Sequence, residues 1–362
     1  MNKNSILKSK IFTLQLIFGV FLMSLLSPAI TFAQETDTAK VEKAEKFSPK
    51  ETILEHISDS HSLHLTYVVG TYIAPLPIIL YTDKGIEVFS SANLEAHEAV
   101  TPYQGKCYKY TVVHNKIKVL NAAGEVDDAA SKKVWDFSIT RNVASMWISI
   151  LVLFIVFIGV SSSYKKRVGK APKGLQSFLE PIILFVRDDI AIPNIGAKYA
   201  RYMPLLLTFF FFILINNVLG LVPFFTGGYN LTGNIAVTIT LATITLLTVN
   251  FSGNKYYWKH ILAPDIPYWL YIIMVPVEII GIISRPFALM IRLFANITAG
   301  HIIVLSLISL IFIFNTLWIS PVSVLFVVFM DVIEVLVAFL QAFIFTMLSA
   351  LFIGMAVEEH HH

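Results

Sequence analysis

Polar and ionisable side chains interrupt the two apolar segments that form the C-terminal third of the chain. They are Glu278, Arg285, Arg292, Asn296, His301, Asp331, Glu334 and Gln341. An ionisable group at membrane depth is costly, and only groups near a helix end can reach water by extending their side chains. Arg292 has apolar sequence on both sides, so this route is closed to it. The set therefore indicates a function, with buried ion pairs that hold helices together as the competing interpretation.

The residue types suit the movement of protons. Arginine keeps its proton at any relevant pH, so Arg292 is a fixed positive charge that repels a hydrated proton and attracts a carboxylate. Glutamate and histidine can take up and release protons near neutral pH when their surroundings tune them. Asparagine and glutamine can hold water. A fixed cation between two sets of titratable groups is what a proton path with two separate halves requires.

Helical geometry places these residues on particular faces. At 100° per residue, Glu278, Arg285, Arg292 and Asn296 fall within about 40° of one another, so they form one polar stripe. His301 lies nine residues beyond Arg292, which puts it on the opposite side of the same helix. In the second segment Glu334 and Gln341 are seven residues apart and share a face, with Asp331 close to Glu334. These residues are candidate partners for His301 or Arg292.

The elements that carry this set are unusually long. Asp265-Ile266-Pro267 resembles a helix start, and the apolar pattern then continues to about Phe314. At about 1.5 Å per residue such a helix exceeds about 60 Å, twice the hydrocarbon thickness of about 30 Å. Residues 315–321 form a break, and a second long segment covers 322–356. Either each segment is one steeply inclined helix, or Arg285-Pro286 divides the first into two spans. No charged loop requires the extra span, so we predict two inclined helices.

The rest of the C-terminal part predicts a multi-pass membrane protein of about five helices. Hydrophobic residues make up 56% of the chain and charged residues only 14%, against about a quarter charged in a typical soluble domain. Further spans are predicted at residues 147–160, 202–222 and 235–249. Residues 175–192 are interrupted by charges and predict an amphipathic helix on the membrane surface. Lysines at 165, 166, 170 and 173 mark the cytoplasmic side, so the C-terminus should be cytoplasmic.

The N-terminal part has a different composition. Residues 1–33 read as a signal peptide, with a basic start, an apolar run and small residues before Gln34; a retained membrane anchor is the alternative. Residues 34–140 then form an extracytoplasmic soluble domain, and residues 141–362 form the membrane domain. Short alternating runs at 65–69, 78–81 and 108–113, separated by turn signals at 83–85 and 122–124, predict a small β-rich domain. Its histidines, His61 included, show no strong metal spacing, so we expect solvated surface side chains.

Several classes of function are disfavoured. The net charge of +3 is too small to indicate a nucleic-acid partner, and the single cysteine, Cys107, excludes an internal disulfide framework or a cysteine-rich metal site. No glycine-rich nucleotide loop occurs. We therefore expect no cofactor, no metal and no catalytic site of the chain's own.

Three runs resemble subunit a of the membrane sector of F-type ATP synthase. The first is RLFANITAGH at residues 292–301, and the second is LQAFIF at 340–345. The third includes Pro204, Asn217 and Pro223, followed by TGN at 232–234. The resemblance covers roughly residues 147–359 and marks a bacterial type with an extended N-terminal outer domain. It implies a stator subunit in the plasma membrane that provides two proton half-channels to a rotating ring of c-subunits, beside the b-subunit peripheral stalk and other synthase subunits.

The resemblance also assigns roles to residues. Arg292 matches the essential arginine that faces the ring carboxylates, and His301 and Glu334 match two polar positions of the outer half-channel. Many bacterial members carry an acid at the first position and a histidine at the second, so this chain has them exchanged, as mitochondrial members do. The remaining matches are Asn296, Gln341 and Asn217 as lining positions and Glu278 as an acid of the inner half-channel. A neighbouring acid common in some members is Gly220 here, which departs from the family pattern.

Two other functions are compatible with a multi-pass chain. A stand-alone proton-coupled secondary transporter should show internal repeats and glycine-flanked unwound helices at the midplane, and no repeat relates the two halves of this sequence. A structural scaffold would leave Arg292 replaceable. The coupling ion is bound by the ring, so the choice between protons and sodium ions stays open, with the relay-like polar set favouring protons.

Overall fold

The computed structural model describes residues 59–67, 70–96, 99–100, 102–113, 116–121, 123–167, 169–221, 231–262, 267, 270–314 and 318–358. The predicted signal peptide and the charged linker after it lie outside these residues. The chain forms two compact units. One comprises the chain up to Arg141 with Leu219–Tyr229 and Ile303–Val332, and the other comprises Asn142–Val218, Asn230–Ile302 and Ile333–His362.

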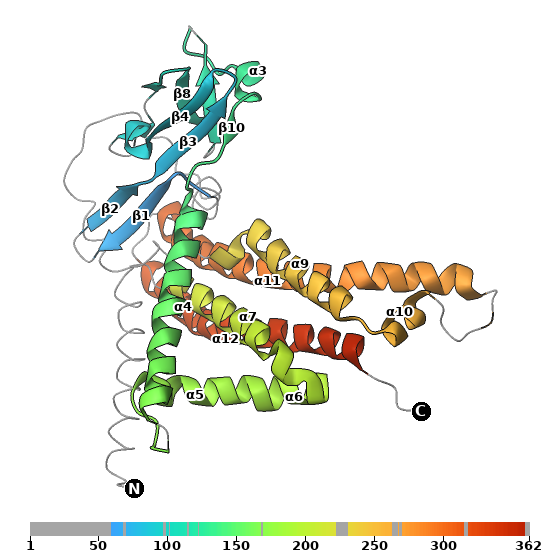
Figure 1. Cartoon of the computed structure of the whole chain (residues 1–362). Helices are drawn as coiled ribbons and strands as arrows, with labels where there is room; N and C mark the ends of the chain where they lie inside the picture. The colour runs from blue at the N-terminus through green and yellow to red at the C-terminus, as the bar shows by residue number, and fades with distance from the viewer. Residues whose placement is uncertain are drawn as a thin grey trace, which may run out of the picture. The chain divides into compact units, whose positions relative to one another are not determined.

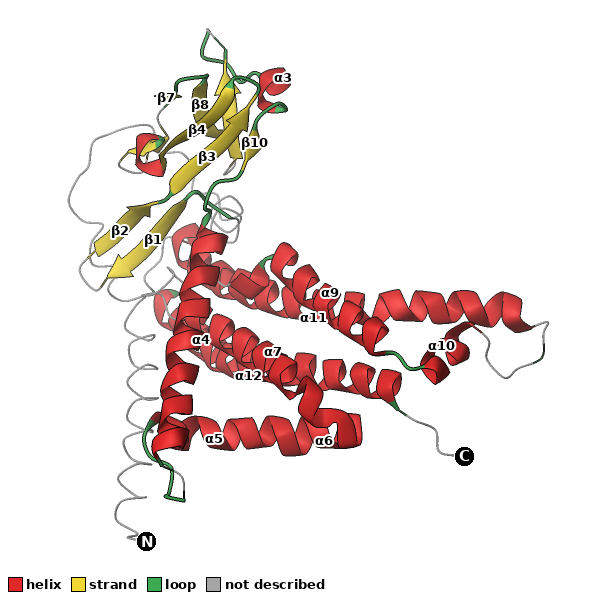
Figure 2. Cartoon of the chain, in the orientation of Figure 1, coloured by secondary structure: helices red, strands yellow, loops and turns green. Residues whose placement is uncertain are grey.

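The N-terminal part is β-rich, as predicted (Figure 2). Its strands are β1 (Ser62–Tyr67), β2 (Gly70–Pro75), β3 (Pro77–Thr82), β4 (Gly85–Ser90), β5 (Glu95–Ala96), β6 (Ala99–Val100), β7 (Tyr103–Gln104), β8 (Lys109–Val113), β9 (Lys116–Leu120) and β10 (Trp135–Asp136), with a 3-10 turn, η1 (Ser91–Asn93), and a short helix, α3 (Asp128–Ser131). They pair into small antiparallel sheets in the orders β1-β2, β10-β3-β4, β5-β6 and β7-β8-β9. The predicted turn at 83–85 joins β3 to β4, where Gly85 has a φ of +127° that side-chain-bearing residues rarely adopt.

One face of the β10-β3-β4 sheet forms the core of this domain. Ile78, Leu80 and Phe89 are buried there, and Tyr110 of β8 packs with them. Glu87 is buried in the same region, where its carboxylate accepts hydrogen bonds from the backbone N–H groups of Lys106 and Cys107 and from the Tyr110 hydroxyl. Burial and the hydrogen bond to Glu87 raise the pKa of Tyr110. The buried charge is thus satisfied by donors, and it joins the β3-β4 hairpin to the β7-β8 segment.

The expectation of solvated histidines is wrong for His61. Its side chain is only 5% exposed, and its Nε2 lies 2.8 Å from Asp136 Oδ2. Although burial opposes the charged form of Asp136, the hydrogen bonds from His61 and Ser138 lower the pKa of this carboxyl group. The pair therefore joins the start of β1 to β10. His64, His97 and His114 lie outside the described side chains.

The rest of the chain is helical (Figure 1). The elements are α4 (Arg141–Lys166), α5 (Leu175–Phe185), a π-helical stretch η2 (Val186–Ala191), α6 (Ile192–Ile195), η3 (Gly196–Lys198), α7 (Tyr199–Leu221), η4 (Leu231–Gly233), α9 (Ile235–Ser252), α10 (Lys255–Leu262), α11 (Tyr271–Phe314) and α12 (Ser320–Val357). Within the described residues, five helical stretches are long and apolar enough to cross a membrane, which confirms the predicted number. One of them runs from Leu175 through α7, so the surface position of residues 175–192 stays a prediction.

Helix α11 is continuous despite two internal prolines. It runs for 44 residues through Pro276 and Pro286, and α12 runs for 38. Arg285-Pro286 therefore does not divide the first segment, and the prediction of two long helices is confirmed. At about 1.5 Å per residue α11 is about 66 Å long, so a bilayer of about 30 Å can hold it only if it is inclined. The α-helix begins at Tyr271, and just before it the Leu270 N–H donates a hydrogen bond to the Pro267 carbonyl; Asp265 and Ile266 of the predicted start lie outside the described residues.

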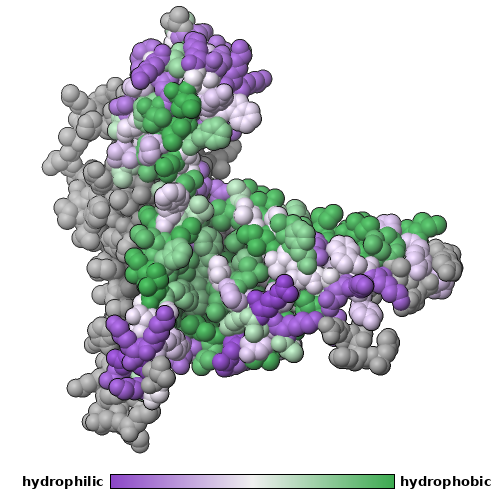
Figure 3. All heavy atoms as spheres, viewed as in Figure 1, coloured by the Kyte–Doolittle hydropathy of each residue, from purple (hydrophilic) through white to green (hydrophobic). Residues whose placement is uncertain are grey.

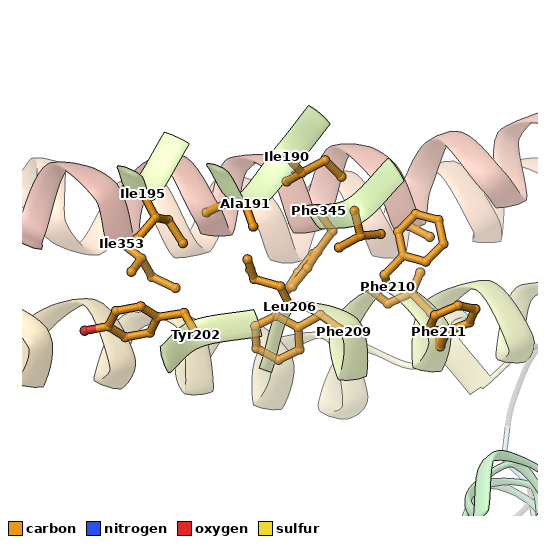
Figure 4. Packing of buried hydrophobic residues seen from close by; sticks show 14 of the residues in the cluster. Ile190, Ala191, Ile195, Tyr202, Leu206, Phe209, Phe210, Phe211, Phe345 and Ile353 are labelled. Atoms are coloured by element: carbon orange, nitrogen blue, oxygen red, sulfur yellow. The ribbon is translucent and has the colours of Figure 1, made fainter. Parts of the chain in front are cut away.

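The helical core forms where the α5–α6 stretch, α7 and α12 meet. Figure 4 shows Leu206 and Phe209 of α7 directed towards Phe345 and Ile353 of α12, with Ile190 close by. The rings of Phe209 and Phe345 are 5.4 Å apart, edge to face, an arrangement that aromatic pairs prefer. A close helix contact adjoins this core, because a methyl group on Gly354 of α12 would overlap the backbone carbonyl of Asn194. This packing holds α12, which carries part of the candidate site.

Candidate functional site

Arg292 lies on the side of α11 that this chain leaves uncovered. The buried side of the helix at this level is formed by Leu289, Leu293 and Ile297, whereas Arg292 and Asn296 are exposed. Arg292 has no ion-pair partner among the described residues. A permanent cation near the middle of a long apolar helix therefore faces outward, where a partner or lipid must meet it.

The surface around Arg292 is made of small side chains. Ser284, Ala288, Ala295 and Ala299 are exposed on the same side of α11, and their spacing follows the helical repeat on either side of the arginine. Small residues on a membrane helix allow another helix to come close. The uncovered face of α11 thus has the form of a helix-packing surface with a positive charge at its centre.

The predicted polar stripe divides into two environments. Arg292 and Asn296 are exposed, but Glu278 and Arg285 are half-buried. The Arg285 guanidinium lies 5.8 Å from the centre of the Phe352 ring and lines a small cavity that Tyr257 also lines. Arg285 thus lies near Phe352 of α12 and Tyr257 of α10, whereas the Arg292 side chain is exposed.

Gln341 connects α12 directly to the arginine's own turn of helix. Its side chain is 2% exposed, and its Nε2 donates a hydrogen bond of 3.4 Å to the backbone carbonyl of Arg292. The bond fixes the height of α12 relative to the turn that carries the arginine.

Glu334 and Gly300 are in contact across the two long helices. A methyl group added to Gly300 would lie 2.5 Å from Glu334 Oε1 and 3.1 Å from Glu334 Cδ, so the absence of a side chain at residue 300 makes room for the carboxylate. Glu334 and the adjoining His301 are both half-buried. The structure therefore brings the carboxylate to the turn of α11 that carries the imidazole.

Asn217 is packed between helices and does not line an open channel. It is fully buried, its Nδ2 donates to the Ala338 carbonyl of α12 at 3.3 Å, and its Oδ1 accepts a hydrogen bond from the Thr232 hydroxyl. One amide thus holds α7, η4 and α12 together. Asp331 is half-buried on α12, three residues before Glu334.

Comparison with known protein families decides what this helical arrangement is. Residues 143–354 match the family model described as ATP synthase A chain. The chain belongs to that family. It is similar to ATP synthase subunit a of Chloroherpeton thalassium, with 50% identity over 63% of this chain and 69% of the relative. It is also similar to ATP synthase subunit a of Pelodictyon phaeoclathratiforme, with 47% identity over 75% of this chain and 82% of the relative.

Membership of the subunit a family confirms the function inferred from the sequence motifs. Proteins of this family are the proton-translocating stator components of the synthase membrane sector, which favours this function over a stand-alone transporter. The N-terminal part matches a separate model, a domain of unknown function (DUF8433), over residues 52–137. The β-rich part thus matches a family separate from that of the helical part.

Two residues of the candidate site were not predicted from the sequence to have a role of their own. Gly300 stands within the family motif but is revealed as the space for Glu334 only by the contact between α11 and α12. Thr232 completes the hydrogen bonding of Asn217. The sequence signal available for both was their place in the matched runs, and neither side chain is ionisable.

We expect Gly300→Ala to reduce proton transport strongly, because its methyl group would displace the Glu334 carboxylate. ATP-driven acidification of inverted vesicles, with subunit content measured by immunoblot, checks this. Gly281→Ala is the matched control: it lies in the same helix, and a methyl group there would meet nothing within 4 Å. Equal transport by the two variants would show that the space at residue 300 is unimportant.

Proposed function

We propose that Arg292 is the fixed barrier between two proton half-paths and faces the carboxylates of a c-subunit ring. The observation that carries this proposal is an exposed, permanently charged side chain on a face of small residues in a 44-residue apolar helix. The small residues would let ring helices approach closely, and the guanidinium would keep each passing carboxylate ionised. A proton could not pass the cation directly, so it would have to travel on the ring.

The titratable residues supply the two half-paths in this proposal. His301 and Glu334 belong to the outer half, where their half-buried groups would relay protons, and Asp331 lies one turn from Glu334 on α12. Glu278 belongs to the inner half. Asn296 and Gln341 line the region next to Arg292, and Asn217 contributes by holding α12 in place through the Ala338 carbonyl.

The same proposal gives the chain a place in the cell. Residues 1–33 act as a signal peptide, residues 34–140 lie outside the cytoplasm, and residues 141–362 form the proton-channel domain in the plasma membrane of a bacterium. The lysine cluster after α4 supports a cytoplasmic position for that end of the helix and for the C-terminus. The partners would be the c-ring, the b-subunit stalk and the other synthase subunits, with protons as the coupling ion. The chain would carry no catalytic site or cofactor of its own.

Reconstitution tests the division of labour between this chain and the ring. Vesicles with an imposed potential would contain this chain alone, a c-ring alone, or both. We expect proton uptake above the background only with both, because each half-path ends at a ring carboxylate. Uptake by the chain alone would contradict the proposal and indicate a continuous path past Arg292.

A further inference from the structure

The β10-β3-β4 sheet has an apolar face that the described chain leaves open. Tyr81 of β3, Ile86 and Val88 of β4, and Trp135 and the following Phe137 are 54–69% exposed. Their register brings them together, because Tyr81 pairs with both Ile86 and Trp135. In Figure 3 the strand-bearing unit shows hydrophobic residues in green beside hydrophilic ones in purple.

This face is unusual because the other face of the same sheet already forms the domain core. Ile78, Leu80 and Phe89 alternate with the open residues and are buried. An antiparallel sheet with one face on a core normally places polar residues on the other. Contiguous apolar surface of this kind marks a place where something binds.

The open face is connected to a membrane helix by a short, hydrogen-bonded tether. Phe137 N–H donates to the Ile79 carbonyl and Ile139 N–H to the Pro77 carbonyl, so the chain stays along β3 after β10. The next helix, α4, begins at Arg141, whose N–H donates to the Ser60 carbonyl. The four residue steps from Phe137 to Arg141 span at most about 14 Å. Phe137 therefore lies near the N-terminal end of α4.

The composition of the face fits a lipid–water boundary. Tryptophan and tyrosine are enriched at that level of membranes because their rings are apolar with a polar edge. Two exposed lysines, Lys132 and Lys133, come shortly before Trp135 in the chain, whereas the Lys84 ammonium lies over the Tyr108 ring and donates to the Cys107 carbonyl. Aromatic and branched side chains with lysines close by in the sequence match the headgroup region of an anionic bilayer.

We propose that the face formed by Tyr81, Ile86, Val88, Trp135 and Phe137 rests on the bilayer surface next to α4. The aromatic and aliphatic side chains enter the headgroup region, and Lys132 and Lys133 pair with lipid phosphates. The β-rich domain would then bind the membrane surface beside the first membrane helix and would not move freely on a tether. Neither the proton path nor the sidedness of the chain is needed for this inference.

Spin labels on the full chain test the proposal. Cys107 is replaced by alanine, and a label is attached at Ile86→Cys or Val88→Cys on the face, or at Ala123→Cys, an exposed loop position, as the control. The chain is reconstituted at high dilution into phosphatidylethanolamine–phosphatidylglycerol vesicles. Collision with oxygen, which concentrates in lipid, is compared with collision with a water-soluble nickel complex.

We expect both face labels to collide mainly with oxygen and the Ala123 label mainly with nickel. Face labels as accessible to nickel as the control would overturn the proposal and leave a protein partner as the occupant. Dipolar broadening of the face labels would also overturn it, because it would show a second copy of the chain on this surface. Circular dichroism of each labelled chain confirms that the variant is folded.

Discussion

Arg292→Ala is expected to abolish ATP-driven acidification of inverted vesicles. Without the cation, a ring carboxylate passing α11 would have no opposite charge to keep it ionised, and no repulsion would stop a proton from crossing between the two half-paths. The side chain is exposed and makes no ion pair with described residues, so its loss should leave the fold of this chain intact. The vesicles should also leak protons when an outward gradient is imposed.

Arg292→Lys should fail as well, which separates the guanidinium from a simple positive charge. A lysine can lose its proton when it is desolvated and lacks the planar fork that grips a carboxylate. Ile291→Ala, at an exposed neighbouring position on α11, is the control and should retain pumping. Subunit content and the ATPase rate of the vesicles establish that the complex is assembled. Normal pumping by Arg292→Ala would refute the barrier role.

The long helices could be predicted because their signal is local and strong. A long apolar pattern with no charged loop predicted continuity through Arg285-Pro286, and α11 indeed passes through Pro286. A proline is tolerated inside a membrane helix because neighbouring groups can satisfy the carbonyl that it frees.

The sequence predicts which residues could form the candidate site, but it does not predict their contacts. Helical angles placed Arg285 and Arg292 on one stripe, yet Arg285 meets Phe352 while Arg292 stays exposed. Which neighbour stands beside each turn depends on the crossing of two helices, and a sequence carries no direct record of that register. The contact of Gly300 with Glu334 and the hydrogen bond from Gln341 are of the same kind.

The error at His61 has the same origin. Its partner, Asp136, lies 75 residues away in the chain, and a polar residue near turn signals is exposed more often than buried. Long-range contacts bring the two segments together, among them the hydrogen bond from the Arg141 N–H to the Ser60 carbonyl. Long-range pairing also creates the open apolar face, because Trp135 and Tyr81 become neighbours through it. Local sequence patterns therefore predict that the N-terminal domain is β-rich, but they do not predict which of its side chains are exposed.

Glu334→Gln is expected to remove most proton transport while leaving the complex assembled. Glutamine keeps the shape of the side chain that fits the space at Gly300 but cannot release a proton, so a relay through this position would stop. ATP-driven acidification and subunit content are measured together. The effect should resemble that of Gly300→Ala in transport, although that variant moves the carboxylate and this one replaces it.

A second variant, Glu334→Asp, separates a proton-carrying role of Glu334 from a structural one. Aspartate can still titrate, so some transport should return, reduced because the shorter side chain draws the carboxyl group back from Gly300. A merely structural role for Glu334 predicts the reverse order, with the better-fitting glutamine more active than aspartate. Unchanged transport in Glu334→Gln would remove this residue from the path. If the aspartate variant is more active than the glutamine variant, Glu334 takes up and releases a proton during transport, next to the turn of α11 that carries His301.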